Sequence, residues 1–583
     1  MIVLKGIGAS PGVSIGRAYV LEDEELVVTR LDVARGMRPG EVRRFRAAQK
    51  ATYLDLDAAE AKVLKLLGKT HAKLIDAHRL ILKDPLIVRE VPQRIMREGV
   101  NAEFALSETM EAVNKQFEKM DDEFFRERRH DLLDVGRRLL GHLMKLTHKS
   151  LSDATSGSIV VAKNILPSEA LGLQDAKIMG FATDLGGKSS HTAILAQSLE
   201  LPAVVGLSNA SRSVKTGDAV ILDGEQGVVI VNPSPETVAR YRRVQQAEEE
   251  TKKELLGLRG LPATTLDGRT FGLEANLDSL EDIKGVAALN PDGIGLFRTE
   301  SLFLNRTEPP GEREQTDAYA EVLKAFEPKP VVIRIADLGG DRMAQLGLEA
   351  PKSEANPFLG LRGIRLFLRH PDVLKTQLRA ILRAAAGKDV KILFPMISSA
   401  EEIRGARDIL QRAQDELKAL GVPATKSLKV GIMVEVPSAA LLLDAFLPLV
   451  DFVSIGTNDL IQYVLAVDRI NDYVAQLYDP FHPAVVRILD IIVKAAHRQN
   501  KPVSLCGGMG SDPQAVPLAA GLGVDSLSVS PRLFLRVKQT LRGLRYDAVA
   551  AAVGKALSCI ESEGVRRAIT EAAPFLSSRA PGE

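Results

Sequence analysis

The sequence lacks a cysteine framework. Its two cysteines, Cys506 and Cys559, stand far apart and without CxxC spacing, whereas disulfide-stapled domains and structural zinc sites need several cysteines at close spacing. Such sparse cysteine usage is typical of a protein in a reducing compartment. We therefore expect a cytoplasmic protein.

Long apolar runs and an excess of one charge are also missing. No stretch of about 18 apolar residues occurs, and the start, MIVLKGIGASPG, has no cationic region followed by an apolar one, so we expect neither export nor membrane insertion. The 76 lysines and arginines balance 75 aspartates and glutamates, for a formal net charge of +1. This balance argues against an extended basic surface for nucleic acid, so any anion must be bound by a local group of residues.

The chain does have room for several domains, because 583 residues suffice for roughly three or four. Residues 1–22 and 150–231 carry short β-branched runs such as SIVVAK and AVILD, whereas in residues 23–149 apolar residues recur at the three- and four-residue steps of amphipathic helices. We predict one α/β domain formed by 1–22 and 150–231, interrupted by an inserted helical bundle at 23–149. Residues 232–262 begin with NPSPE and continue as a charged helix, which indicates a linker.

The last part of the chain, residues 263–575, alternates strand-like and helical segments. Its eight short apolar or β-rich runs are TFGLEANL, GIGLFR, VVIRIAD, KILFPMI, VGIMVEV, FVSIGTND, VSLCGG and DSLSVSP. Eight such βα alternations over about 300 residues predict a (β/α)8 barrel, in which reactive groups stand where strands end and the following loops begin. The predicted fold class is therefore multidomain α/β.

Acidic residues follow two neighbouring strands of this predicted barrel. Glu435 comes after the fifth run, and Asn458 and Asp459 end the sixth. Because neighbouring parallel strands lie about 4.8 Å apart, the two carboxylates are placed to share a hard cation such as Mg²⁺. Either acid alone could instead cap the helix that follows it.

Basic residues stand at the same predicted mouth. Arg298 closes the second run, Arg334 lies in the third, and Arg469 follows the sixth. Their planar guanidinium groups match phosphate and carboxylate oxygens. One arginine alone would ordinarily be a solvated surface residue, but three beside a metal site indicate a small phosphorylated acid as the ligand.

Cys506 ends the seventh run. A cysteine in this position is often just a small buried apolar residue. If the substrate becomes an enolate after losing its phosphate, a thiol near the methylene carbon could instead donate the proton.

One histidine stands in an unusual setting, the segment GGKSSHTAILAQSLELP. Ser189 or Ser190 can cap a helix beginning near Thr192, so His191 lies at the helix N-terminus, where free N–H groups and the helix dipole favour a phosphate. The glycines before it allow close approach by a donor or acceptor. The alternative is an ordinary residue at a helix cap.

Several motifs, in one order along nearly the whole chain, closely resemble enzyme I of the bacterial phosphoenolpyruvate-dependent sugar phosphotransferase system. They are GIGASPGVSIGRA, GGKSSHTAILAQSLELPAVVG, GIGLFRTESLFLNR, ADLGGDR, NPFLGLRGIRL, LFPMIS, GIMVEVPSAA, SIGTNDLIQYVLAVDRIN and SLCGGMGSDP. The resemblance implies that phosphoenolpyruvate binds in the barrel with Mg²⁺ and passes its phosphoryl group to Nε2 of His191. A small phosphocarrier protein, HPr, would then dock on the helical insertion and accept the group. A homodimer through the barrel is implied as well.

The family's roles carry over by motif onto individual residues. The resemblance implies that Arg298 and Arg334 bind the phosphate, that Asn458, Asp459 and Arg469 contact the substrate, and that Glu435 and Asp459 hold Mg²⁺. His191 is the implied phosphorylated intermediate, and Cys506 resembles the acid that protonates the enolate of pyruvate. Because the histidine and the substrate belong to different domains, a rigid-body swivel about the 232–262 linker is expected.

Two positions depart from the family's pattern. Where the family commonly reads CGE after the cysteine, this chain has Gly508, which removes a carboxylate that could tune the thiol. Where the family usually has a threonine bonded to the active imidazole, this chain has Ala170, which cannot make that bond.

Three alternatives stay open at the level of sequence. A pyruvate phosphate dikinase or phosphoenolpyruvate synthase shares the phosphohistidine and barrel modules but adds an ATP-binding domain, for which this chain has neither a GxxxxGK[ST] motif nor room. A nitrogen-related paralogue would serve a different carrier. A non-catalytic scaffold would keep the fold without turnover.

Overall fold

The computed structural model describes residues 1–21, 28–118, 123–144, 154–165, 177–187, 192–193, 196, 199, 201–304, 306–339, 346–349, 354, 356–425, 428–469, 471 and 473–579. The chain falls into two compact units, Met1–Thr251 and Lys252–Glu583. Among the described residues, no helix combines the length and the apolar character that a membrane span requires.

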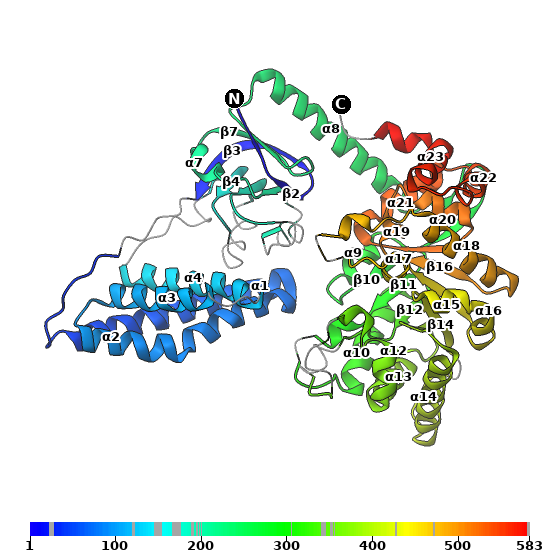
Figure 1. Cartoon of the computed structure of the whole chain (residues 1–583), viewed down its shortest axis with the longest axis horizontal. Coiled ribbons are helices and arrows are strands. Elements are labelled where there is room, and N and C mark those ends of the chain that lie inside the picture. The colour runs from blue at the N-terminus through cyan, green and yellow to red at the C-terminus, as the bar shows by residue number, and fades with distance from the viewer. Residues whose placement is uncertain are drawn as a thin grey trace. The chain divides into compact units, whose positions relative to one another are not determined.

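The first unit contains a mixed eight-stranded sheet (Figure 1). Its order is β1-β8-β7-β3-β4-β5-β6-β2, formed by β1 (Ile2–Lys5), β2 (Ile7–Ser10), β3 (Val13–Leu21), β4 (Ser158–Ala162), β5 (Gly180–Thr183), β6 (Ala203–Val205), β7 (Ala219–Asp223) and β8 (Val228–Val231). Strands β3 to β6 run parallel to one another, and β4 is buried along its length, as expected for an internal parallel strand. Because β3 pairs with β4, the segment between them interrupts a single sheet.

Helices make up most of the interrupting segment. They are α1 (Arg38–Lys83), η1 (Leu86–Glu90), α2 (Val91–Glu98), α3 (Ala102–Glu118) and α4 (Glu123–Met144). On α1, Phe45, Ala48 and Leu56 are buried on one helical face and belong to a cluster with Val135 and Leu139 of α4. The three- and four-residue apolar spacing of the sequence thus forms the core of a helical bundle.

Helix α8 (Pro235–Gly257) follows the sheet. Ser234 caps its start, because the Ser234 hydroxyl accepts the Thr237 N–H at 3.2 Å. Tyr241 is buried in a cluster with Val13, and the Gln245 amide donates to the Val13 carbonyl at 2.8 Å. The first half of α8 is therefore packed on the sheet of its own unit.

The second unit is built on a closed barrel of parallel strands. These are β10 (Thr270–Leu277), β11 (Ile294–Arg298), β12 (Val331–Arg334), β13 (Val390–Phe394), β14 (Lys429–Val434), β15 (Phe452–Gly456), β16 (Val503–Cys506) and β17 (Ser526–Val529). Strand β10 pairs with both β11 and β17, which closes the ring, and the short β9 (Ala263–Thr264) adds to β10 antiparallel. The predicted barrel, and with it the multidomain α/β fold class, is confirmed.

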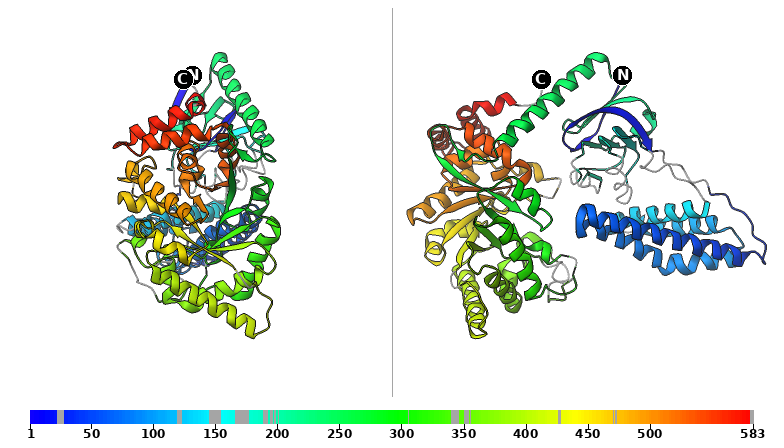
Figure 2. Two further views of the ribbon diagram at one scale, coloured as in Figure 1. Left: turned by 90° about the vertical axis from the view of Figure 1, so that its right-hand side faces the viewer. Right: turned by 180° about the vertical axis from the view of Figure 1, so that it is seen from behind.

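Helices surround the strands in the views of Figures 1 and 2. They are α9 (Ile283–Ala288), α10 (Glu312–Phe326), α12 (Ile364–Arg369), α13 (Pro371–Ala384), α14 (Ala400–Ala419), α15 (Pro437–Leu441), α16 (Leu443–Phe446), α17 (Thr457–Leu465), α18 (Pro483–Arg498), α19 (Gly508–Ser511), α20 (Val516–Leu522), α21 (Phe534–Gly543), α22 (Tyr546–Ala556) and α23 (Ser562–Ala572).

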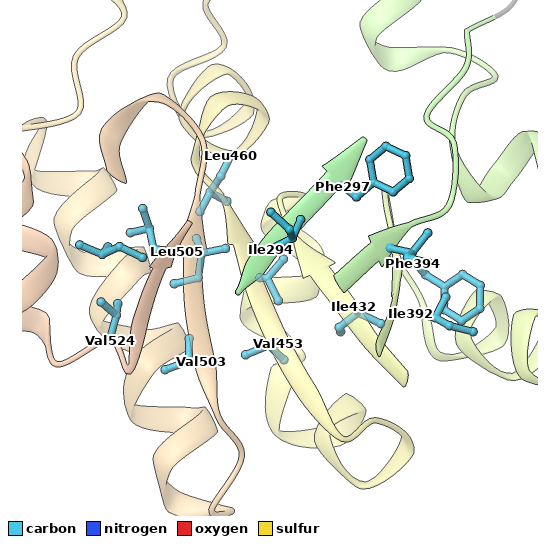
Figure 3. Close-up of a cluster of buried hydrophobic side chains, with 14 of the residues drawn as sticks. Ile294, Phe297, Ile392, Phe394, Ile432, Val453, Leu460, Val503, Leu505 and Val524 are labelled. Atoms are coloured by element: carbon cyan, nitrogen blue, oxygen red, sulfur yellow. The ribbon is translucent and has the colours of Figure 1, made fainter. Parts of the chain in front are cut away.

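Alternation along the strands separates two sets of buried side chains. Ile392, Phe394 and Ile432 belong to the large core between strands and helices (Figure 3). Leu393 and Met433, one position on, belong to a smaller cluster that fills the ring and includes Cys506. Residues that follow this inward set at the strand ends therefore reach the mouth of the barrel.

Candidate active site

The strand ends bring the predicted barrel residues to one mouth. Arg298 and Arg334 are the last residues of β11 and β12, Glu435 directly follows β14, and Cys506 ends β16. The register pairs Arg298 with Arg334 across the two strands. All these positions lie at the C-terminal face, where barrel enzymes carry their reactive groups.

Asn458 and Asp459 lie slightly beyond the position predicted for them. Strand β15 ends at Gly456, and helix α17 begins at Thr457, so both residues belong to the first turn of that helix. Arg469 lies in the loop after α17 and directs Nη2 to within 3.4 Å of Asp459 Oδ1. The helix turn and the loop thus approach the same mouth.

Arg334 is almost completely buried, and its fork faces carboxylates. Its Nη2 donates to Glu300 Oε1 at 2.7 Å, and its Nη1 lies 3.9 Å from Asp337 Oδ2. The neighbouring Arg298 is more exposed and donates to Asp278 Oδ1 at 2.9 Å. Two adjacent strands therefore present guanidinium groups whose orientation is already fixed by acidic partners.

Arg362 belongs to this cluster, although the sequence did not single it out. Its Nε donates to Asp337 Oδ1 at 3.1 Å, its Nη2 donates to Asp337 Oδ2 at 2.6 Å, and Nη2 also lies 3.7 Å from Asp459 Oδ2. Gly363, with a φ of +56°, makes the approach possible, because a Cβ there would lie 3.1 Å from Asp337 Oδ1 and 2.9 Å from Met396 Cβ. Gly363, the second glycine of NPFLGLRGIRL, was the feature of the sequence that could have indicated this close approach.

Two buried carboxylates, those of Glu435 and Asp459, lie among these arginines. Glu435 Oε1 accepts the Met396 N–H at 2.6 Å. Burial raises the pKa of Glu435 to about 8, and the negative charges of Asp459 and Asp337 act in the same direction while Arg334 opposes them. Of the fully buried oxygens of this pair, Asp459 Oδ1 is the one left without a hydrogen bond.

This donor set fits a hard divalent cation. Among the described residues, no group of three or more His, Cys, Asp and Glu side chains forms a closed metal cage. Two carboxylates with an unsatisfied oxygen suit a cation such as Mg²⁺, which usually takes one or two protein carboxylates and completes its shell with water and phosphate oxygens.

Cys506 is buried beneath this mouth, 1% exposed. Its Sγ accepts a hydrogen bond from the Ser454 hydroxyl at 3.3 Å and donates to the Ile455 carbonyl at 3.4 Å. Burial raises the pKa of the thiol, and the Ser454 hydrogen bond opposes that increase. The thiol is therefore held in its protonated form at neutral pH.

Asn458 and an aromatic ring complete the mouth. Asn458 Oδ1 accepts the Gly508 N–H at 2.8 Å, which connects α17 to the loop after Cys506. The ring of Phe358 lies 5.5 Å from the Arg362 guanidinium carbon and 5.7 Å from that of Arg469. Two cationic groups thus share one aromatic side chain.

His191 and Ala170 lie outside the described residues. Nearby, Thr192 is buried, and its hydroxyl donates to the Ile165 carbonyl at 3.3 Å. Gly186 has a φ of +117°, a backbone conformation that favours glycine.

The chain matches three protein families. Residues 252–546 match the PEP-utilising enzyme, PEP-binding domain; residues 5–128 match the PEP-utilising enzyme, N-terminal; and residues 154–227 match the PEP-utilising enzyme, mobile domain. An NMR solution structure described as Enzyme I (nEIt) protein is 38% identical, covers 42% of this chain and 99% of its own, and gives a TM-score of 0.38.

Curated relatives match over nearly the whole length. The phosphoenolpyruvate-protein phosphotransferases of Bacillus sp. (strain S) and Geobacillus stearothermophilus are each 42% identical over 96% of this chain and 96% of their own. That of Bacillus subtilis (strain 168) is 41% identical over 96% of this chain and 98% of its own. The chain therefore belongs to the phosphoenolpyruvate-protein phosphotransferases, the enzyme I family of the phosphotransferase system, and is an enzyme of phosphoenolpyruvate-dependent phosphoryl transfer.

Proposed function

We propose that the barrel mouth binds phosphoenolpyruvate, that the phosphoryl group passes in line to Nε2 of His191, and that an HPr-like phosphocarrier then accepts it. The observation that carries this proposal is the convergence of Arg334, Arg362 and Arg469 on the buried acids Asp337 and Asp459 at one mouth. A small, highly charged anion with a bound cation is the ligand that such a group of alternating charges recognises.

The arginines supply the substrate contacts. Arg298 and Arg334, paired across β11 and β12, bind the phosphate oxygens, while Arg469 and the Asn458 amide contact the rest of the substrate. Their forks are already oriented by carboxylates, so little reorganisation is needed when an anionic group takes the place of those partners.

Glu435 and Asp459 hold Mg²⁺, and Asp459 thereby also contacts the bound substrate. When bound, the cation neutralises charge on the substrate oxygens and polarises them. The proposed Mg²⁺ site is supported by two buried acids, of which Asp459 has an oxygen without a hydrogen bond. Arg362 Nη2 lies 3.7 Å from Asp459 Oδ2 and Arg469 Nη2 lies 3.4 Å from Asp459 Oδ1, so both arginines hold this carboxylate at the mouth.

Cys506 acts as the acid in the second half of the reaction. Loss of the phosphoryl group leaves the enolate of pyruvate, whose methylene carbon takes up the thiol proton. The burial of the thiol supports this role, because a raised pKa keeps the proton in place until a basic carbon is near.

The domains divide the reaction between them. We assign residues 1–22 and 150–231 to the phosphohistidine domain, 23–149 to carrier binding, 232–262 to the linker and 263–575 to phosphoenolpyruvate binding. The match of 154–227 to the PEP-utilising enzyme, mobile domain supports this division. A swivel of the phosphohistidine domain then carries His191 from the barrel to the carrier.

The protein is proposed to act in the cytoplasm as a homodimer. The sparse cysteines support a cytoplasmic location. A homodimer through the barrel is part of the same proposal, by resemblance to the family. A dikinase-like enzyme would require ATP, and a nitrogen-related paralogue would phosphorylate a different carrier, so a transfer assay distinguishes both from the proposed function.

The test is transfer to purified carriers. The full chain is mixed with phosphoenolpyruvate, Mg²⁺ and either HPr or a nitrogen-related carrier, and carrier phosphorylation and pyruvate are measured together. We expect HPr to gain one phosphoryl group per pyruvate released, without ATP. Transfer only to the other carrier, or a requirement for ATP, would contradict the proposal.

A further inference from the structure

Ser454 contacts the thiol that the reaction uses. It lies on β15 and donates its hydroxyl hydrogen bond to Cys506 Sγ at 3.3 Å, across the strand pair β15–β16. The thiol in turn donates to the backbone carbonyl of Ile455 at 3.4 Å. Ser454 and Cys506 are each 1% exposed. One rotamer of the thiol is thus fixed by a donor and an acceptor from the same neighbouring strand.

The strand register explains why the hydroxyl reaches the sulfur. Gly456 is the register partner of Cys506, and Ser454, two positions earlier, points to the same interior face of the barrel. A Cβ at Gly456 would lie 2.7 Å from Glu435 Oε2, so the glycine keeps the space beside the carboxylate open. Ser454 therefore reaches the sulfur from within the barrel, and Gly456 leaves room for the Glu435 carboxylate at the strand end.

Gly508, in the segment after Cys506, has no side chain that could donate a hydrogen bond to the sulfur. Its N–H is already donated to Asn458 Oδ1 at 2.8 Å. The charged groups that act on the thiol are Glu435, which raises its pKa, and Arg298 and Arg334, which lower it. Ser454 adds a neutral donor in direct contact with the sulfur.

A hydrogen bond to sulfur matters most after the proton has left. The thiolate is the stronger acceptor, so a hydroxyl that already points at the sulfur stabilises the charged product more than the neutral thiol. Since the Ser454 hydroxyl already points at the buried sulfur, it needs no reorientation as the charge develops.

We propose that Ser454 is a positioning residue for the protonation of the enolate, acting through the Cys506 thiol. The S–H bond breaks, and the electron pair of the enolate C=C bond forms the new C–H bond as the enolate oxygen becomes the pyruvate carbonyl. The hydroxyl of Ser454 stabilises the thiolate, which regains its proton from water. This inference rests on the acid role proposed for Cys506.

The test follows deuterium in the full-length enzyme. In D2O with Mg²⁺, phosphoenolpyruvate and pyruvate, NMR measures deuterium entering the methyl group of pyruvate, and rapid quenching measures phosphoenzyme formation separately. We expect Ser454→Ala to slow deuterium incorporation roughly tenfold, the effect of one lost hydrogen bond to a charged group, with phosphoenzyme formation nearly unchanged. The alkaline limb of the exchange rate should move to higher pH, because the thiol loses a group that lowers its pKa.

Matched variants separate the explanations. Ser504→Ala removes the same hydroxyl from the register partner of Ser454 and should leave exchange unchanged, while Ser454→Thr should restore part of the rate. The inference would be overturned if Ser454→Ala exchanged deuterium at the wild-type rate. It would also be overturned if deuterium exchange and phosphoenzyme formation slowed equally and the alkaline limb of the exchange rate did not shift. Either result would leave Cys506 as the acid. Wild-type exchange in Cys506→Ala would instead overturn the proposed acid role and this inference together.

Discussion

Arg362 holds both carboxylate oxygens of Asp337, with Nε 3.1 Å from Oδ1 and Nη2 2.6 Å from Oδ2. Asp337 is buried; although burial alone would raise its pKa, the charges of Arg334 and Arg362 hold that pKa below its usual value. The pair fixes the direction of a guanidinium group at the mouth of the barrel.

Removing one member of this pair should destabilise the barrel. Asp337→Asn leaves Arg362 and Arg334 short of a counter-charge, and breaking a buried ion pair costs about 3 kcal/mol or more. We expect calorimetry to give a lower unfolding temperature for the barrel transition. Asp372→Asn is the matched control, because Asp372 is 94% exposed and lies 3.7 Å from Lys375; an equal effect of both substitutions would contradict the account.

The metal site can be tested by separating the two directions of transfer. Glu435→Gln or Asp459→Asn removes a carboxylate from the proposed Mg²⁺ site, so transfer from phosphoenolpyruvate should be abolished. Back-transfer from a phosphorylated carrier to His191 does not use the barrel and should be preserved. Loss of both reactions in a variant would point to a folding defect rather than to a metal site.

The stability of the barrel and its stabilisation by Mg²⁺ should both depend on pH, because the pKa of Glu435 is about 8 in the folded barrel. A carboxyl group whose pKa is raised by folding contributes its full stabilisation to the metal-free fold at pH values below its pKa in the unfolded chain. For Glu435 this contribution is lost as the pH rises through about 8, its pKa in the folded barrel. A cation competes with the proton, so the rise in unfolding temperature produced by Mg²⁺ should be larger at high pH than near neutrality. In Glu435→Gln this pH dependence should disappear; if it persists, another group controls binding.

Phe358 offers a test of substrate binding that removes no charge. Its ring lies beneath the guanidinium groups of Arg362 and Arg469, and such contacts contribute about 1 kcal/mol each. Phe358→Leu loses both contacts, about 2 kcal/mol together, and should therefore raise the KM for phosphoenolpyruvate by up to roughly thirtyfold with a smaller change in kcat. The adjacent Leu359 is 63% exposed, so Leu359→Ala should leave KM unchanged; a shift of the same size there would argue against the role of the ring.

Much of the barrel was predictable because the strands are short apolar runs, and β11, β12 and β14 end at or directly before a charged residue. Arg298, Arg334 and Glu435 could be assigned to the mouth from this pattern alone, since parallel strands bring their C-terminal ends together. Arg362 could not, because it precedes a helix rather than ends a strand, and its contact with Asp337 depends on the positive φ of Gly363.

The contacts inside the ring were equally hidden in the sequence. Ser454 belongs to an apolar run, and its contact with Cys506 depends on the register between β15 and β16, which only the folded barrel fixes. Asn458 and Asp459 were placed within one turn of their observed positions, because a short strand that runs directly into a helix carries no boundary signal.

The central claim is that a phosphoryl group loaded at the barrel mouth comes to rest on one histidine. The most direct measurement incubates the enzyme with Mg²⁺ and phosphoenolpyruvate labelled in its phosphate, then maps the labelled peptide. We predict a single acid-labile, base-stable label on His191 that is absent from His191→Ala. A label that survives in that variant, or that maps to another residue, would contradict the account.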